Sequence, residues 1–268
     1  MMSKRPFRNR PGRGSSWTSE ETPLRRTPPQ VRLAAGVVTV NGARGFIIET
    51  ARAYRTRRGD LVRRARLVVT AAHCLPSVPR AHAASKIEER TYSNLLGRLG
   101  EEEPTVWAEC AFIDTVADIA VLAQPDPQLL KLEAEAYDAL VDEAPAFEVT
   151  TARRRSGRGW LLGLDLQWQP CIVGHSGAIW ITKATGGICG GMSGSPILNG
   201  RVQVIGTVAV RTTLGDAALE AREPDGVQTQ GGPNPALRAC LPGWILRGLK
   251  TARVMAKDGQ SPSPREAQ

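Results

Sequence analysis

The sequence predicts an all-β protein, built as a barrel or as a sandwich. Short apolar runs rich in Val and Ile recur along most of the 268 residues, and turn residues separate them. Asn199-Gly200, with an apolar run on each side, is a strong signal for a β-hairpin. These features favour antiparallel sheets over a helical fold.

In the first half of the chain, strands are expected over 36–40, 45–49 and 65–69, with another over 119–122. The segment Arg52 to Arg64 is expected to be an extended, charged loop that overhangs the region around His73. Gln124-Pro125-Asp126-Pro127 should end the strand at 119–122, because proline lacks the N–H that a sheet ladder needs.

Residues 128–141 then show a partly helical pattern that is acidic on its polar face, which predicts a helix between the two halves. Its expected role is to cover the junction of the halves, and a docking role is the alternative. In the second half, strands are expected over 147–150, 160–164, 167–173, 178–182, 195–198 and 202–210. Residues 237–249 are expected to form a closing helix interrupted at Pro242.

Three short motifs carry chemistry. An apolar run at 67–69 leads through small residues to His73, and Asp118 opens the apolar run at 119–122. Ser193 lies between two glycines in Gly191-Met192-Ser193-Gly194-Ser195-Pro196, a turn that holds a hydroxyl outward beside backbone N–H groups. His, Asp and Ser together form a charge-stabilised nucleophile, in which histidine accepts the serine proton and aspartate orients the imidazole.

These motifs resemble the chymotrypsin-fold (trypsin-like) serine peptidases. The resemblance rests on Thr-Ala-Ala-His-Cys at 70–74, Asp-Ile-Ala-Val-Leu at 118–122 and Gly-Met-Ser-Gly-Ser-Pro at 191–196, in the family's order, and spans about residues 34–247. The Gly-Ser-Pro ending is similar to the bacterial glutamyl endopeptidase branch. The resemblance implies two six-stranded antiparallel β-barrels with a C-terminal helix, with barrels at about 34–125 and 145–235 and a closing helix at 236–249.

The resemblance also implies the roles of single residues. His73 is the general base, Asp118 its orienting partner and Ser193 the nucleophile, while the N–H groups of Gly191 and Ser193 form the oxyanion hole. The specificity pocket is expected at Gly187, Val208, Ala209 and Arg211. Gly187 stands where trypsin carries an aspartate, which disfavours cleavage after Lys or Arg, and the absence of a histidine from 205–210 disfavours strict glutamate preference.

Two further features concern activation and alternatives. Met192 stands where zymogen-activated relatives carry an aspartate, so activation by a newly cut N-terminus is not expected; constitutive activity or control by a partner protein stays open. A catalytically silent binding module with the same fold is the runner-up hypothesis. Ser176, in Gly174-His175-Ser176-Gly177-Ala178, resembles a hydrolase nucleophile elbow, but a strand and not a helix is expected after it.

The five cysteines, Cys74, Cys110, Cys171, Cys189 and Cys240, are an odd number. By the resemblance, Cys74 and Cys189 occupy half-cystine positions without their usual mates. Reduced thiols and a cytoplasmic location are therefore expected, in agreement with an N-terminus that has no apolar signal segment. No cofactor and no metal are expected, since the three histidines are scattered.

The net charge of +9 is concentrated in residues 1–33, 52–66 and 153–158. Such patches suit nucleic acid or an anionic surface. Solvated loops and a solvated tail are favoured, because the patches lack interleaved aromatic residues. Residues 1–33 are expected to be a disordered basic arm and 250–268 a flexible tail, and no apolar run is long enough for a transmembrane helix.

Overall fold

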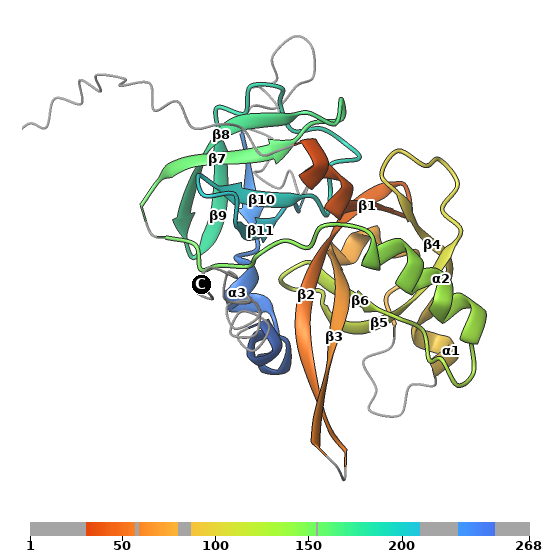
Figure 1. Ribbon diagram of the computed structural model, residues 1–268. Helices are drawn as coiled ribbons and strands as arrows, with labels where there is room; N and C mark the ends of the chain where they lie inside the picture. Colours follow the sequence, from red (N-terminus) through yellow and green to blue (C-terminus); the bar gives the residue numbers. More distant parts are fainter. Residues whose placement is uncertain (1–30, 57–58, 80–86, 154, 210–229, 250–268) are drawn as a thin grey trace, which may run out of the picture.

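The strands of the chain form two six-stranded antiparallel sheets, one from each half (Figure 1). The computed structural model describes residues 31–56, 59–79, 87–153, 155–209 and 230–249. The first sheet contains β1 (Val37–Val40), β2 (Ala43–Thr56), β3 (Gly59–Thr70), β4 (Thr91–Arg98), β5 (Val106–Asp114) and β6 (Ile119–Ala123). It closes into a barrel in the order β1-β2-β3-β6-β5-β4.

The second sheet contains β7 (Gly157–Leu162), β8 (Trp168–Ser176), β9 (Ala178–Thr182), β10 (Pro196–Asn199), β11 (Val204–Thr207) and β12 (Gly231–Asn234). Its order is β11-β10-β7-β8-β9-β12, and an isolated antiparallel bridge between Gly206 and Ala236 brings the two edges together. The molecule is thus mostly β, with two six-stranded barrel-like sheets and few helices. This confirms the predicted fold class, a chymotrypsin-like double barrel.

Hydrophobic patterning explains why these segments are strands. In β9, Ile179 and Ile181 are buried while Trp180 between them is partly exposed, as expected for a strand with one face in a core. In β6, the run from Ile119 to Leu122 is buried throughout, since β6 lies between β3 and β5. The apolar periodicity of the sequence therefore identifies the interior strands well.

A shared hydrophobic core joins the two sheets. Phe147, in the segment between them, packs edge-on against Phe46 of β2 at a centroid distance of 5.8 Å and against Trp168 of β8 at 6.3 Å. Leu237 and Ile245, from the C-terminal segment, are buried in the same cluster. The junction between the two sheets is therefore apolar, and it contains residues from both sheets and from the C-terminal segment.

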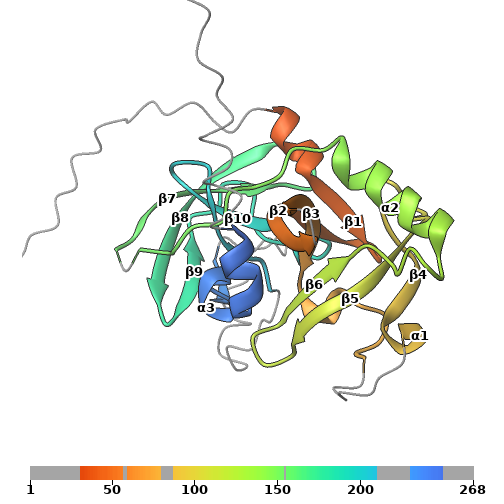
Figure 2. The ribbon, with the colours of Figure 1, turned by 60° about the horizontal axis from the view of Figure 1, so that its bottom comes forward.

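Helices cover the outside of this arrangement (Figure 2). A 3-10 helix, η1 (Val31–Gly36), precedes β1, and α1 (Ile87–Arg90) precedes β4. α2 (Lys131–Asp142) lies against the first barrel, where the buried hydroxyl of Tyr137 donates to the carbonyl oxygens of Arg66 and Leu122. No helix in the described part of the chain is long and apolar enough to cross a membrane.

The C-terminal segment agrees with its prediction. α3 (Leu237–Cys240) ends at Leu241, and a second helix covers 243–249, so the break falls at Pro242 as expected. Proline cannot donate the backbone hydrogen bond that would continue the first helix. The predicted arm and tail lie outside the described residues, apart from 31–33.

The structure corrects three sequence expectations. The segment Arg52 to Arg64 is not a loop, because β2 and β3 pair from Gly45↔Thr70 to Thr56↔Gly59 as one long hairpin (Figure 1). Residues 147–150 form isolated bridges and not a strand. The sequence patterns also did not predict β4 and β5. The register of the pairing between these two strands shifts between Tyr92 and Leu96, and this shift interrupts the regular alternation of inward and outward side chains.

Candidate active site

His73 and Asp118 form a close polar pair. The distance between His73 Nδ1 and Asp118 Oδ2 is 2.7 Å, and the backbone N–H of His73 donates to Asp118 Oδ1 over 3.0 Å. Both carboxylate oxygens of Asp118 therefore contact one residue. This arrangement fixes the ring plane and favours the tautomer with its proton on Nδ1, which leaves Nε2 able to accept a proton.

Strand pairing explains why these two residues meet. β3 and β6 are antiparallel with Thr70 opposite Ala120, so the residues after Thr70 and those before Ala120 lie at the same end of the barrel. His73 lies on the 3-10 turn η2 (Ala72–Cys74) that follows β3. Asp118 lies in the turn before β6 and has a positive φ of 55°. A positive φ at a non-glycine residue is uncommon, but aspartate adopts it more readily than most.

The turn before Asp118 is held by a second carboxylate. Asp114 Oδ1, at the end of β5, accepts hydrogen bonds from the N–H groups of Val116 and Ala117 at 3.0 and 2.9 Å. Such an Asx-type arrangement stabilises the tight connection between β5 and β6. The orientation of Asp118 is therefore set by the strand ends and not by a mobile segment.

The serine loop, residues 191–196, is held mainly by backbone hydrogen bonds. The N–H of Met192 donates to Cys189 O, that of Ser195 to Met192 O, and that of Gly194 to Val208 O of the following strand segment. Gly191 and Gly194 have φ of 84° and 80°, in the region that favours glycine. The glycines on either side of Ser193 therefore allow the sharp turn that the sequence predicts there.

Two N–H groups of the loop donate no hydrogen bond to any other described residue: those of Gly191 and Ser193. They are the two groups assigned to the oxyanion hole by the family resemblance. Ser193 is 7% exposed, whereas Gly191 is exposed. Unpaired N–H groups at a tight turn are suited to hold an anionic oxygen.

The serine loop lies against the strand ends of the first barrel. The N–H of Arg44, on β2, donates to Ser193 O over 2.9 Å, and Arg44 O accepts from Thr70 Oγ1 over 2.7 Å. Thr70 ends β3, three residues before His73. The structure therefore places the serine loop beside the strand that carries His73, although no hydrogen bond joins the His73 and Ser193 side chains among the described residues.

The predicted pocket residues are only partly described. Val208 and Ala209 are buried, and Gly187 is buried with a φ of 73°; Arg211 lies outside the described residues. Ile188, beside Gly187, packs so close to Gly231 of β12 that a Cβ on that glycine would lie 2.7 Å from Ile188 Cδ1. Ile188, next to Gly187 in sequence, therefore packs tightly against β12 in space.

Asn234, which the sequence analysis did not single out, links this region together. Its side chain is buried; Oδ1 accepts from the N–H of Ala209 over 2.9 Å, and Nδ2 donates to Ile179 O and Gly231 O. Its position between two prolines was visible in the sequence, but nothing there indicated long-range contacts. Arg44 was missed for the same reason.

Cysteine side chains lie near this site, among them Cys189, whose Sγ is 3.7 Å from Met192 Sδ of the serine loop. All five cysteines are free. Burial raises the pKa of the Cys74 thiol to about 11 and that of the Cys171 thiol to about 12, so neither is a nucleophile near neutral pH. Among the described residues, no three His, Cys, Asp or Glu side chains gather in a way that could hold a metal ion.

The alternative serine motif does not form a nucleophile elbow. Ser176 ends β8, Gly177 turns the chain with a φ of 73°, and β9 follows at Ala178. The elbow needs a strand followed by a helix. The expectation that a strand follows Ser176 is therefore confirmed.

Comparison with known proteins gives little beyond the fold. No family profile matches the chain, and no curated protein matches its sequence. Among solved structures, the apo form of the MamO protease domain from Magnetospirillum magneticum is similar, with 12% sequence identity and a TM-score of 0.41. The similarity covers 78% of this chain and 95% of that one, and at this level it says nothing about catalysis.

Proposed function

We propose that this protein is a serine endopeptidase that cleaves peptide bonds by acyl transfer to Ser193. The observation that supports this most is the His73–Asp118 pair, at 2.7 Å, at the barrel end beside a serine loop with two unpaired N–H groups. An isolated His–Asp pair is common in proteins. The same pair beside a tight serine turn whose N–H groups are unpaired is a combination suited to nucleophilic catalysis.

The proposed reaction begins when Ser193 Oγ attacks the carbonyl carbon of the scissile peptide bond while His73 Nε2 takes the hydroxyl proton. Asp118 stabilises the imidazolium through Nδ1–H. The N–H groups of Gly191 and Ser193 hold the oxygen that becomes negative. His73 then gives the proton to the leaving amine, the C–N bond breaks, and an ester with Ser193 remains.

Water completes the cycle by the same groups. His73 removes a proton from water, the hydroxide attacks the ester carbon, and the proton returns to Ser193 Oγ as the acid leaves. The cycle requires a hydrogen bond between His73 and Ser193, which is not formed in the described structure. Such bonds often tighten only when substrate is bound.

The surroundings of Gly187 support a preference for a small or medium apolar residue on the acyl side of the cleaved bond. Ile188 and Val208 are buried in the same hydrophobic cluster, and Ala209 beside Val208 is buried as well. An apolar lining selects apolar side chains because burying an unpaired charge is costly.

Cleavage of a mixed peptide library, read by mass spectrometry, tests the proposal. Wild-type protein should produce cleavages after small apolar residues, and the Ser193→Ala variant should produce none. Equal cleavage by both proteins would show that the activity comes from a contaminant or from another residue. Cleavage mainly after Lys, Arg or Glu would contradict the specificity while leaving the class intact.

A second candidate function is peptide binding without turnover. The lack of a His73–Ser193 hydrogen bond in the described structure is the observation that favours it. Peptides retained by wild type and by Ser193→Ala with equal affinity, and recovered uncut from both, would support a binding module.

A further inference from the structure

Arg44 is a buried charged residue at the junction of the two barrels. Only 5% of it is exposed, and its guanidinium donates from Nη1 to Leu162 O over 2.6 Å and from Nη2 to Gly163 O over 3.0 Å. These two carbonyl groups lie where β7 of the second sheet ends. A residue of the first barrel therefore holds the end of a strand in the second.

The backbone of the same residue holds the serine loop. Its N–H donates to Ser193 O, and its carbonyl oxygen accepts from Thr70 Oγ1 on β3. Arg44 thus contacts the segment before His73, the residue proposed as nucleophile and the second sheet. No sequence motif of the family resemblance includes it.

The turn that the Arg44 side chain holds contacts the other end of the serine loop. Leu166 N donates to Gly163 O and Gly163 N to Gln167 O, which defines a tight turn after β7. Leu164, at its tip, lies 3.5 Å from the position that a Cβ on Gly191 would occupy. The turn held by the Arg44 side chain therefore lies beside Gly191, and the Arg44 backbone holds Ser193, so both ends of the serine loop's Gly191–Ser193 segment lie next to groups fixed by Arg44.

The energetic cost of burying this charge argues for a role in geometry. Desolvation lowers the pKa of Arg44, and the nearby Cys189 and Asp165 oppose that effect. This cost is offset in part by the hydrogen bonds to Leu162 O and Gly163 O, which would lose their donor if an apolar side chain replaced the guanidinium. A guanidinium fixes two acceptors at once in a rigid fork, which an apolar chain cannot do.

We propose that Arg44 is a positioning residue for Ser193, which fixes the serine loop by holding both Ser193 and the turn that lies beside Gly191. This role rests on the proposed peptidase function. Gly191 and Ser193 bear the two N–H groups assigned to the oxyanion hole, and such donors stabilise charge only when their direction is set before the reaction. Loss of the Arg44 fork should therefore slow acylation more than it weakens ground-state binding.

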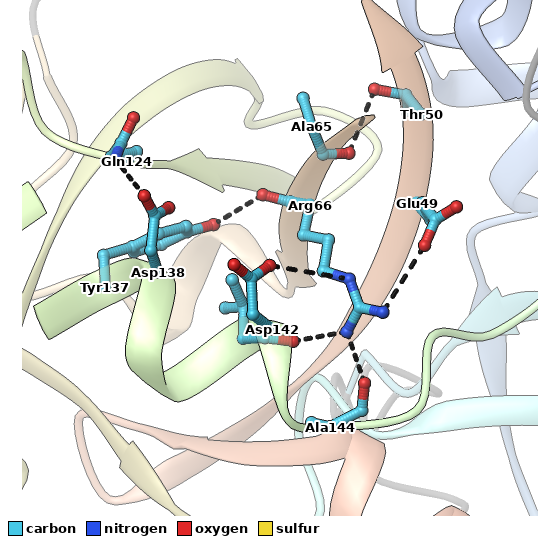
Figure 3. Close-up of polar contacts among 10 residues, drawn as sticks. Glu49, Thr50, Ala65, Arg66, Gln124, Tyr137, Asp138, Asp142 and Ala144 are labelled. Carbon is cyan, nitrogen blue, oxygen red and sulfur yellow. Dashed lines mark hydrogen bonds and ion pairs between the residues drawn. The ribbon is translucent and has the colours of Figure 1, made fainter. Parts of the chain in front are cut away.

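The chain offers a matched control in Arg66 (Figure 3). Arg66, on β3, also donates from its guanidinium to two carbonyl oxygens, those of Val141 and Ala144, and pairs with Glu49 and Asp142. It holds α2 and the segment after it, and none of these partners belongs to the serine loop. Arg66→Met removes a guanidinium that also holds two backbone carbonyl oxygens, through Nη1, from the same barrel and away from the serine loop.

The experiment measures the second-order rate of labelling by a fluorophosphonate probe, together with kcat and KM for a peptide substrate, well below the thermal midpoint. Wild type, Arg44→Met, Arg44→Lys and Arg66→Met are compared in the full chain. Arg44→Met should label at least about tenfold more slowly, by analogy with removal of one oxyanion donor, with the loss in kcat and not in KM. Arg44→Lys, which can reach one carbonyl, should recover part of the rate.

Arg66→Met should lower the thermal midpoint yet label within about twofold of wild type, since its contacts lie away from the reacting atoms. Labelling of both Arg44 variants at the wild-type rate would overturn the role of Arg44 while leaving the peptidase intact. Equal slowing in Arg66→Met would overturn it too, because the effect would then follow stability. If Arg44→Met does not fold, the kcat of Arg44→Lys decides. A wild type that is not labelled would instead contradict the proposed function and remove the basis for a positioning role.

Discussion

Gly194 lies directly against the carbonyl oxygen of Arg44, so close that a Cβ on this glycine would overlap that oxygen. The same Cβ would lie 2.6 Å from Thr70 Oγ1, which donates to the Arg44 carbonyl. With a φ of 80°, the position also favours glycine for its backbone conformation. The glycine after Ser193 is therefore required by packing between the barrels as well as by the turn.

Gly194→Ala should destabilise the protein severely, because the added methyl meets backbone atoms that cannot move alone. Gly191→Ala is the matched comparison, since its added Cβ would meet only Leu164 Cδ2, at 3.5 Å, and its cost should come from the positive φ, about 1–2 kcal/mol. Urea denaturation of both variants measures the difference. Equal free energies of unfolding would contradict the close approach of Gly194 to Arg44.

Asp118→Asn should keep the fold and lose activity. Asparagine also tolerates the positive φ of 55° at this position, but its amide is neutral and can present the wrong hydrogen-bonding group to His73. A loss of about 10⁴-fold in kcat is expected for a working triad. Alanine tolerates this φ less well than asparagine, so Asp118→Ala should also lower the thermal midpoint. Calorimetry of the two variants checks this expectation, since Asp118→Ala should unfold at the lower temperature.

Asn234→Ala should destabilise the protein by about 1–3 kcal/mol, because the buried N–H of Ala209 loses its acceptor. The variant should also raise KM for peptide substrates more than it lowers kcat, since Ala209 lies in the proposed specificity region and not at the reacting atoms. Urea unfolding and steady-state kinetics measure the two effects. A fall in kcat at constant KM would contradict a role of Asn234 in the specificity region.

Stability should fall at alkaline pH through the buried thiols. Burial raises the pKa of Cys74 to about 11, above the value near 9 for an exposed thiol. Between these values the unfolded chain has lost the proton while the folded chain keeps it, so the stabilisation is complete below pH 9 and is lost as pH rises toward 11. The contribution is on the order of 2–3 kcal/mol.

Urea unfolding at pH 8 and at pH 10.5 tests this effect, with Cys74→Ala as the comparison. The free energy of unfolding should fall less steeply with pH in the variant than in the wild type, because other groups titrate equally in both. Parallel pH profiles for the two proteins would show that the thiol of Cys74 does not contribute.

Local patterns in the sequence predicted most of the strands, although not β4 and β5, and they placed His73 and Asp118 next to strand ends. His73 and Asp118 follow or precede buried apolar runs, and antiparallel pairing then brings such residues to one barrel end. Only the outer part of the hairpin, 52–64, was expected to be a loop, since its arginine-rich sequence shows no apolar alternation. Pairing between β2 and β3 continues through this part and defines it as strand.

Arg44 and Asn234 could not be predicted for a different reason. Arg44 contacts residues 118 or more positions away, and Asn234 contacts Ile179 across 55 positions. A single arginine or asparagine in a sequence does not indicate which distant residues it contacts. The contacts of the Arg44 side chain form between the two sheets, and those of Asn234 form within the second sheet once its strands are paired.

The most direct test of the account is the site of covalent modification by a fluorophosphonate probe, mapped by mass spectrometry of the digested protein. Wild-type protein should carry one phosphonate group per chain on the peptide that contains Ser193, and this adduct should be absent after denaturation before labelling and strongly reduced in His73→Ala. A folded wild-type protein that carries no adduct, or carries it on another serine such as Ser176, would contradict the assignment of Ser193 as the nucleophile.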